Sequence, residues 1–269
     1  MLVAGLLVVS PFAVGPALGA DAPAWNHDVA DAVHGPSAWG KVDSSFETCA
    51  SGQAQSPIDL TVTRPARLAA LRLDDPAAPL VVENTGHVIE VPIPAEVGAQ
   101  LRVGNDVYYL EQFHFHAPSE HTVRGRHADL EVHLVHRDAA GRLAVVAILM
   151  TIGKHPNALV DRIAAAAPPV AGEERDTGTT VWPTDLLTVR SHAGRAVVAR
   201  YLTYAGSLTT PPCTEGVRWF VADQPTTVSA AAVRRLHRLI MQFPGYHGYP
   251  DNNRPTEPRN GRPVLRNGR

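Results

Sequence analysis

Gln112-Phe113-His114-Phe115-His116 alternates polar and aromatic side chains, and this alternation decides how the chain is expected to fold. Side chains along a β-strand point alternately to its two faces. Gln112, His114 and His116 therefore share one face of a predicted strand, while the two phenylalanines enter a hydrophobic core on the other. Two imidazoles on one face can reach a single metal ion, although hydrogen-bonded or exposed histidines would give the same pattern.

A second stretch, Leu130-Glu131-Val132-His133-Leu134-Val135-His136, alternates in the same way. His133 lies on one face of this predicted strand, where it can complete a three-histidine set with His114 and His116. His136 points to the opposite face and is not expected to bind the metal. Three neutral nitrogen ligands with one open position are typical of a catalytic zinc site, because structural zinc sites are normally closed by four protein ligands. The two stretches together predict a catalytic Zn²⁺ centre.

Two further polar side chains share these faces with the predicted ligands. Gln112 lies beside His114, and Glu131 lies beside His133. A side chain in such a position can accept the N–H of a ligating imidazole and fix its tautomer. Gln112 and Glu131 are therefore predicted to support the ligands without binding the metal themselves.

The rest of the chain predicts one domain, mainly β with peripheral helices (α+β), built on a large, mostly antiparallel central sheet. Leu143–Met150 is almost continuously apolar, as a central strand buried on both faces would be. One helix is expected over about Asn157–Ala166, and another from the N-cap Ser229 to about Met241. The stretch from Asp251 onward is rich in Pro, Asn and Arg and is expected to be irregular. The predicted strands are 80–82, 87–93, 99–103, 107–116, 130–136, 143–152 and 217–222.

Composition narrows the class of protein. The chain has 269 residues, of which 45% are hydrophobic and 19% charged, so it can bury a sizeable core. The formal net charge is −2 and the sequence pI is about 6.7, which implies no basic face. Nucleic acid is therefore not an expected partner, and no stable membrane association is expected either. The 13 histidines weakly favour metal or proton chemistry.

The first twenty residues are apolar, uncharged and end in small side chains. This pattern is typical of a secretory signal peptide, with cleavage expected at about residues 19–22 and a mature domain over 21–269. A transmembrane anchor is the alternative, which Pro11 and Pro16 disfavour in a run barely long enough to span a bilayer. The sequence therefore predicts export.

Cys49 and Cys213 are the two cysteines of the chain. In an exported protein two cysteines suggest one disulfide, with two buried free thiols as the alternative. Closing so long a loop could stabilise the fold by roughly 5 kcal/mol in the chain-entropy model.

These stretches resemble the active-site signature of the α-class carbonic anhydrases, and of secreted bacterial members in particular. The matching blocks occur in family order over about residues 25–258, nearly the whole predicted mature chain. Cys49 and Cys213 also match the positions of the two cysteines that form a disulfide in secreted members of the family, so the resemblance implies that they are paired. Besides the two histidine stretches, the matching blocks are Gln55-Ser56-Pro57-Ile58-Asp59-Leu60, Asn84-Thr85-Gly86-His87, Ser119-Glu120-His121-Thr122-Val123, Leu143-Ala144-Val145, Tyr204-Ala205-Gly206-Ser207-Leu208-Thr209-Thr210-Pro211-Pro212-Cys213, Trp219 and Asn252-Asn253-Arg254-Pro255.

The resemblance implies a zinc lyase that reversibly hydrates CO2 to bicarbonate and a proton by attack of zinc-bound hydroxide. Thr209 matches the gatekeeper hydroxyl of the family, which donates its proton to Glu120 and orients the nucleophile. His87 matches the residue that shuttles the proton to solvent. Tyr204 is implied to support the hydrogen bonds around Thr209 and the segment that contains Asn252 and Arg254. The resemblance also implies a side esterase activity and a periplasmic or extracellular location. It makes a homodimer a candidate for the oligomeric state.

The resemblance further implies an apolar pocket for CO2, which has no charge by which it could be held. Each of these residues would also suit an ordinary hydrophobic core. A catalytically silent binding protein and a different zinc hydrolase, such as an esterase, are the alternatives to a carbonic anhydrase. No peptidase-type His-Glu-x-x-His motif is present. The matching pocket residues are Val135, Val145, Leu208, Thr210, Val217 and Trp219.

Two positions depart from the family pattern. Where most relatives have Trp-Gly-Tyr, this chain has Trp25-Asn26-His27, so a histidine replaces a tyrosine or the segment is shifted. Glu90 stands where many relatives have Asn or Gln, and a carboxylate near His87 would raise the pKa of that imidazole if both faced the cavity. Both departures concern proton transfer and leave the predicted ligands intact.

Overall fold

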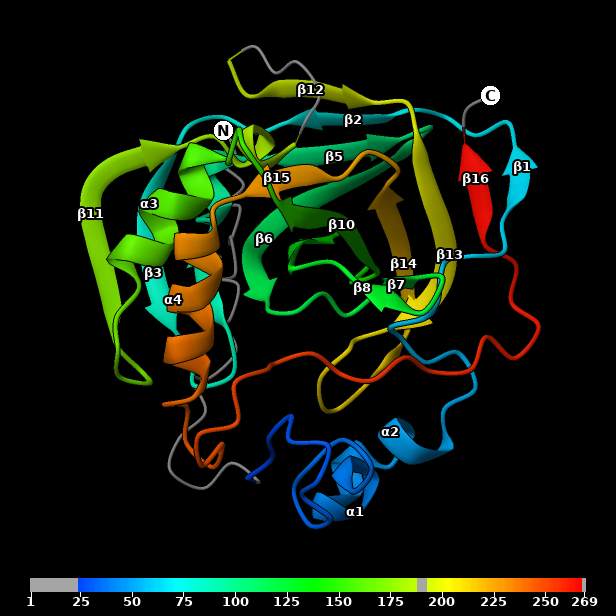
Figure 1. The fold of residues 1–269 in the computed structure, drawn as a ribbon. Helices are drawn as coiled ribbons and strands as arrows, with labels where there is room; N and C mark the ends of the chain where they lie inside the picture. The colour runs from blue at the N-terminus through cyan, green and yellow to red at the C-terminus, as the bar shows by residue number, and fades with distance from the viewer. Residues whose placement is uncertain (1–23, 188–192, 268–269) are drawn as a thin grey trace, which may run out of the picture.

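The architecture is known from a computed structural model, which describes residues 24–187 and 193–267. Fourteen strands form one large sheet, and β7 and β8 form a separate two-stranded ribbon (Figure 1). The main path of the sheet is β1-β16-β13-β14-β10-β9-β6-β4-β3-β11; β5, β2 and β12 extend it beside β6, and β15 pairs with β10. The strands are β1 (Arg64–Ala66), β2 (Leu71–Asp74), β3 (Ala78–Asn84), β4 (Ile89–Pro92), β5 (Gln100–Val103), β6 (Asp106–His116), β7 (Thr122–Val123), β8 (Arg126–His127), β9 (Leu130–Arg137), β10 (Leu143–Ile152), β11 (Glu174–Val181), β12 (Arg195–Val198), β13 (Tyr201–Ser207), β14 (Glu215–Ala222), β15 (Thr226–Val228) and β16 (Leu265–Asn267).

The predicted fold class is confirmed. Three strand pairs are parallel, namely β1 with β16, β10 with β14 and β10 with β15, and the other pairs are antiparallel. The helices are short and peripheral, and the two longest lie where the sequence predicts them. They are α1 (Trp39–Val42), α2 (Thr48–Ser51), α3 (Ala158–Ala166) and α4 (Ala230–Ile240), with 3₁₀ turns at Ser44–Phe46, Ala95–Val97 and Pro183–Leu186.

Local signals account for the starts of the two long helices. The Asn157 side chain accepts a hydrogen bond from the Leu159 N–H at the start of α3. The Ser229 side chain accepts one from the Ala232 N–H at the start of α4. Such caps satisfy N–H groups that have no partner within the helix. Helix α3 ends at Ala166, just before a pair of prolines that cannot continue it.

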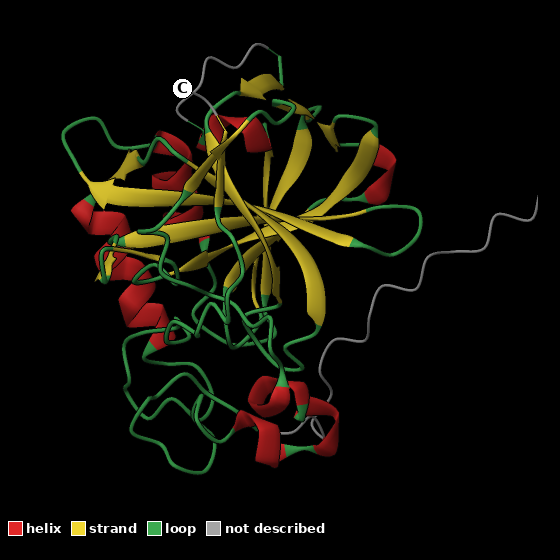
Figure 2. Cartoon of the chain, turned by 90° about the vertical axis from the view of Figure 1, so that its right-hand side faces the viewer, coloured by secondary structure: helices red, strands yellow, loops and turns green. Residues whose placement is uncertain are grey.

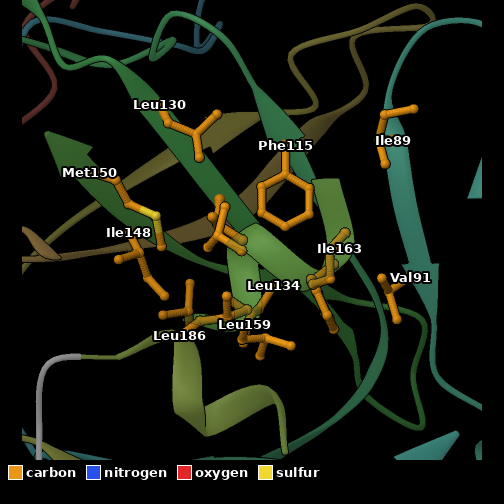
Figure 3. Close-up of a cluster of buried hydrophobic side chains, with 14 of the residues drawn as sticks. Ile89, Val91, Phe115, Leu130, Leu134, Ile148, Met150, Leu159, Ile163 and Leu186 are labelled. Carbon is orange, nitrogen blue, oxygen red and sulfur yellow. The ribbon is translucent and has the colours of Figure 1, made fainter. Parts of the chain in front are cut away.

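The larger hydrophobic core lies on one face of the sheet, under α3 and α4. Phe113 and Phe115 point into it, as the alternation of β6 predicts. Leu159 and Ile163 of α3 pack there with Leu134 of β9 and its neighbours (Figure 3). Burying such apolar side chains stabilises the fold by roughly 1.5–3 kcal/mol each. Because the apolar side chains of β6 and β9 face this core, the alternate side chains, which include the three predicted ligands, face the opposite side of the sheet.

The opposite face is covered by the two ends of the described chain. The chain after α4 crosses below the sheet as an extended segment on its way to β16, and α1 and α2 lie beyond it (Figures 1 and 2). The buried Arg254 in this segment donates to the carbonyl oxygens of Ser56 and Cys49. The expected disulfide between Cys49 and Cys213 is present. These contacts hold the N-terminal segment against the same face of the sheet as the predicted ligands.

The predicted signal peptide, residues 1–20, lies outside the described residues. Within 24–187 and 193–267, no helix is both long and apolar enough to cross a membrane.

The polar strand β11 (Glu174–Val181) was not predicted, because its side chains are mostly exposed at the edge of the sheet and lack apolar alternation. The strand β13 (Tyr201–Ser207) was also missed, although it is almost wholly buried. Its glycine and small polar residues obscure the strand pattern.

The fold yields a prediction for His136, which is buried with Leu134 and Val132 on the core face of β9. Burial lowers the pKa of His136 to about 4, against about 6.5 in an unfolded chain. The unfolded chain therefore takes up a proton that the folded chain refuses, and stability falls as the pH drops from about 6.5 towards 4. His136→Leu should remove this loss, which amounts to about 1.4 kcal/mol per pH unit in this range.

Urea unfolding of the metal-free wild type and of His136→Leu between pH 7 and pH 5 measures the difference. The other histidines titrate in both proteins and cancel in the comparison. Parallel stability curves would contradict the buried, neutral state of His136.

Candidate metal centre

Strand register brings the three predicted ligands together. His114 on β6 lies directly opposite His133 on β9, and His116 follows two residues later on the same face of β6. The ring centroids are 5.2 Å apart for His114 and His133, 5.0 Å for His114 and His116, and 4.7 Å for His116 and His133. One nitrogen from each ring lies within 4.8 Å of the others. The three imidazoles thus form a group that can hold one metal ion.

The two rings on β6 each have one nitrogen engaged by an oxygen acceptor. Nδ1 of His114 donates to Oε1 of Gln112 at 2.8 Å. Nδ1 of His116 donates to the main-chain oxygen of Asn252 at 2.7 Å. An acceptor at one nitrogen of a neutral imidazole requires the proton there and leaves the lone pair on the other. Nε2 of each ring is therefore the nitrogen free to bind a metal.

The ring of His133 is held through its other nitrogen, Nε2, so the free nitrogen is Nδ1. Nε2 of His133 donates to Oε1 of Glu131 at 2.9 Å, which leaves Nδ1 free. Burial alone would raise the pKa of Glu131, but His121 and His133 and their hydrogen bonds hold it well below its usual range. The carboxylate also accepts the N–H groups of Glu120 and His121 at 2.8 Å each. Glu131 is therefore a charged, fully engaged acceptor that orients His133.

All three rings are suited to bind a cation without first losing a proton. Burial lowers the pKa of His116 to about 4, lowers that of His133, and holds that of His114 well below its ordinary value. Nε2 of His116 is buried and has no hydrogen-bond partner among the described residues. Neutral imidazoles with converging lone pairs are the donor set that Zn²⁺ prefers. The residues fit the predicted metal.

A buried carboxyl group lies beside the ligands. Oε2 of Glu120 is 3.6 Å from Nε2 of His116 and 3.8 Å from Nδ1 of His133. Oε1 accepts the main-chain N–H of Arg254 at 2.9 Å. Burial raises the pKa of Glu120 to about 7, although His133, the Arg254 N–H and the nearby Thr209 side chain act against that rise. Glu120 and Thr209 thus lie together at the edge of the three-histidine group.

The predicted apolar pocket residues form a row next to the ligands. Val135 pairs across the sheet with Val145, which in turn pairs with Trp219. The ring of Trp219 lies 4.9 Å from that of His133. Val217 and Leu208 belong to the same hydrophobic cluster, which lies on the ligand face of the sheet. Thr210 lies in the turn after Thr209, partly exposed.

Tyr204 is linked to the Arg254 segment through Ser56, whose main-chain oxygen accepts a hydrogen bond from the Arg254 guanidinium. Its hydroxyl lies 2.7 Å from Nε2 of His121 and donates to Oγ of Ser56 at 2.9 Å. His121 in turn bonds through Nδ1 to Glu131 at 2.6 Å. Through His121, Tyr204 therefore also supports the Glu131 carboxylate. His121 occurs in the matching blocks, but nothing in the sequence signals this chain of contacts.

His87 lies between β3 and β4, stacked on Trp25 with ring centroids 3.8 Å apart and planes at 5°. Burial lowers the pKa of His87 to about 4. Burial is the cause of this shift, and Glu90 does not offset it. In the sheet register Glu90 lies across from His114 and Glu83. Burial and Glu83 raise the pKa of Glu90 itself to about 7. The stacked His87 is therefore neutral at neutral pH.

Asn252 connects the ligand strand β6 to His87 and was not singled out from the sequence as a site residue. Its side chain accepts the Ala117 N–H and donates to the carbonyl oxygens of His87 and Phe115. Its own carbonyl oxygen holds His116. A main-chain carbonyl leaves no signature in residue type, so only the fold identifies it.

The sheet and the three-histidine group define a β-protein with a candidate catalytic metal centre, and comparison with known proteins identifies its family. Residues 34–268 match the family model for eukaryotic-type carbonic anhydrase. A carbonic anhydrase of Klebsiella pneumoniae is 35% identical over 230 residues, which cover 86% of this chain and 87% of the relative.

Solved structures of similar proteins indicate the same family. The Photobacterium profundum α-carbonic anhydrase is 36% identical with a TM-score of 0.76, covering 90% of this chain and 99% of that one. The Thermovibrio ammonificans α-carbonic anhydrase, solved with the inhibitor sulfanilamide, is 33% identical with a TM-score of 0.73, covering 90% and 98%. The chain belongs to the eukaryotic-type, or α, carbonic anhydrase family, which confirms the predicted enzyme class.

The geometry yields a prediction for Glu131. Glu131→Gln removes the charged acceptor that fixes the His133 ring, so Zn²⁺ should dissociate about 10- to 100-fold more readily. Competition with a chromophoric chelator measures the affinity. Glu111→Gln is the matched control, because Glu111 lies on the exposed side of β6 and pairs with Arg137. Equal zinc affinity in wild type and Glu131→Gln would show that Glu131 does not orient the ligand.

Proposed function

We propose that this chain hydrates CO2 reversibly to bicarbonate and a proton, with one Zn²⁺ held by His114, His116 and His133. The observation that carries the proposal is the convergence of three free imidazole nitrogens beside Glu120 and an apolar wall. Nε2 of His114, Nε2 of His116 and Nδ1 of His133 would hold the ion. Carbonic anhydrase is the reference case for such a site: a bound zinc ion lowers the pKa of its water to about 7, a value that belongs to the family rather than to this chain.

Glu120 and Thr209 orient the nucleophile in this proposal. Glu120 would be ionised in the presence of a divalent cation, because a nearby positive charge lowers the pKa of a carboxyl group. The Thr209 hydroxyl then donates its proton to Glu120 and keeps its lone pairs for the attacking oxygen. Fixing the nucleophile in this way reduces the entropy that the reaction must lose.

The apolar row beside the ligands binds CO2. Val135, Val145 and Trp219 present hydrocarbon next to the ligand His133, with Leu208 and Val217 in the same cluster. CO2 has no net charge, so an apolar surface can hold it while water is excluded. The same residues would admit an activated ester, and a side esterase activity is part of the proposal.

His87 carries the product proton to solvent. While stacked on Trp25 it has a pKa of about 4, too low to hold a proton at neutral pH. A relay works best when its pKa is near the working pH, so the ring must move into water to be protonated. Movement between a stacked and a hydrated position would couple proton uptake to proton release.

The chain is further proposed to be exported, with residues 1–20 as a signal peptide and 21–269 as the mature enzyme. The disulfide supports this proposal, because such bonds persist in oxidising compartments. A periplasmic or extracellular location follows.

Loss of a single ligand tests the proposal. His114→Ala removes one of three imidazoles, so stoichiometric zinc binding and CO2 hydration should both be lost. Metal analysis and stopped-flow CO2 hydration, with and without a chelator, measure the two. His155→Ala, at an exposed position between β10 and α3, is the control. Full zinc content and normal turnover in His114→Ala would refute the ligand set. A zinc-loaded wild type without CO2 hydration would favour a silent binding protein.

Inhibition by one compound tests whether CO2 hydration and the side ester hydrolysis take place at the same site. Sulfanilamide, which binds the Thermovibrio ammonificans relative, should block CO2 hydration and ester hydrolysis at the same concentration.

The shuttle has its own test. His87→Ala should slow turnover in weak buffer by about 10-fold or more, because general acid–base groups contribute at least this much. Added imidazole should restore the rate. Indifference of His87→Ala to buffer concentration would place the proton path elsewhere.

A further inference from the structure

The segment that holds the proposed ligand His116 is itself tied to helix α4. His237, in the last turn of α4, donates a hydrogen bond from Nδ1 to the main-chain oxygen of Pro250 at 2.8 Å. The same nitrogen lies 3.3 Å from Oδ1 of Asp251. These two residues directly precede Asn252. One side chain on a helix thus fixes the start of the extended segment that enters the metal centre.

The position of Asn252 matters because most of its polar atoms are engaged at the metal centre. Its main-chain oxygen accepts the hydrogen bond from Nδ1 of His116 at 2.7 Å. Its side chain accepts the N–H of Ala117 and donates to the carbonyl oxygens of Phe115 and His87. Hydrogen bonds weaken steeply when their geometry is disturbed. A displaced Asn252 would therefore loosen the acceptor that fixes the tautomer of His116.

The two sides of Asn252 are anchored by different kinds of side chain. On the C-terminal side the buried guanidinium of Arg254 donates to three oxygens of the N-terminal part of the chain. An arginine stays charged at every physiological pH, so this anchor is permanent. On the N-terminal side the anchor is His237, whose side chain is 28% exposed. The charge of a histidine changes within the physiological range of pH, so this second anchor can respond to pH.

Negative groups surround the His237 ring and favour its protonated form. The hydrogen bond to Asp251 raises the pKa of His237 above its ordinary value, and burial acts against that rise. The main-chain oxygen of Pro250 and the charge of Asp129, which precedes β9, act in the same direction as Asp251. The ring also lies at the C-terminus of α4, where the helix dipole favours a cation. Arg234, one turn earlier on α4, is the opposing charge and is exposed.

We propose that His237 is a positioning residue for the metal centre, whose protonated ring holds the start of the segment that fixes His116. The inference rests on the proposed zinc site. The charged contact is at full strength below about pH 6.5, the ordinary pKa of histidine, and weakens as the pH rises through the raised pKa of His237. The neutral ring keeps only an ordinary hydrogen bond. At mildly acidic pH, where protons compete with zinc for the three ligands, the contact therefore opposes loss of the metal.

Transfer of zinc from the loaded enzyme to an excess of a chromophoric chelator, at pH 6 and at pH 9, tests the proposal. His237→Gln keeps a donor for the Pro250 oxygen but carries no charge. Its rate of zinc release relative to the wild type should be about fivefold higher at pH 6, the factor by which a charge-assisted hydrogen bond exceeds a neutral one. The ratio should approach one at pH 9. Protonation of the ligands affects both proteins and cancels in the ratio.

Companion variants separate the charge of the ring from its packing. His237→Arg stays charged, so it should release zinc as slowly as the wild type at pH 6 and more slowly at pH 9. Asp251→Asn removes the acidic partner and should speed release at pH 6 by a smaller factor, which keeps the test decisive if the helix variants fold poorly. His155→Gln, the same change at an exposed histidine, should match the wild type at both pH values.

Hydrogen–deuterium exchange in the metal-free protein gives a readout that does not depend on zinc. The main-chain N–H of Asn252 donates to the oxygen of Ala117 at 3.2 Å. At pH 6 this N–H should exchange about fivefold faster in His237→Gln than in the wild type, because the charged contact no longer opposes local opening. The difference should be lost at pH 9.

A ratio of release rates for His237→Gln that is the same at pH 6 and pH 9 would overturn the proposal, because it would leave no role for the charge of His237. If the wild type binds no stoichiometric zinc, the proposed function fails, and His237 is then judged by the exchange of the Asn252 N–H. Equal exchange in the wild type and His237→Gln at pH 6 would overturn the inference on its own.

Discussion

Each of the three imidazoles at the centre of this protein has one nitrogen tied to a fixed oxygen acceptor. Gln112 holds His114, the carbonyl of Asn252 holds His116, and Glu131 holds His133. These bonds decide which nitrogen carries the proton and therefore which lone pairs converge. Burial keeps the rings neutral, so they are ready to bind a cation. The metal chemistry proposed for this chain depends on that arrangement.

The sheet supplies the arrangement through its two unlike faces. The core under α3 and α4 takes the phenylalanines of β6, and the ligands must then face the opposite side. On that side the chain around Asn252 and Arg254 reaches under the sheet to hold His116 and Glu120. The site is thus assembled from strand register and from a long extended segment that carries few apolar residues.

Alternation alone predicts the three ligands, Gln112 and Glu131, whereas Glu120, Thr209, His87 and the apolar pocket residues were predicted only through the family resemblance. Residues 112–116 and 130–136 each assign a face to every side chain, and the structure places His136 in the core as expected. The role of Asn252 could not be predicted from the sequence, because a main-chain carbonyl that accepts a hydrogen bond can belong to any type of residue. The partners of Tyr204 and the stacking of His87 on Trp25 join residues far apart in the chain, and no local pattern indicates such contacts. Strand β11 was missed because exposed edge strands lack apolar periodicity.

A crystal structure of the zinc-loaded protein, with anomalous diffraction at the zinc edge, tests the ligand arrangement most directly. One zinc ion should be bound by Nε2 of His114, Nε2 of His116 and Nδ1 of His133, with the acceptor bonds to Gln112, Asn252 and Glu131 intact. Zinc bound through the opposite nitrogen of any ring, or through the carboxylate of Glu120 or Glu131, would contradict it.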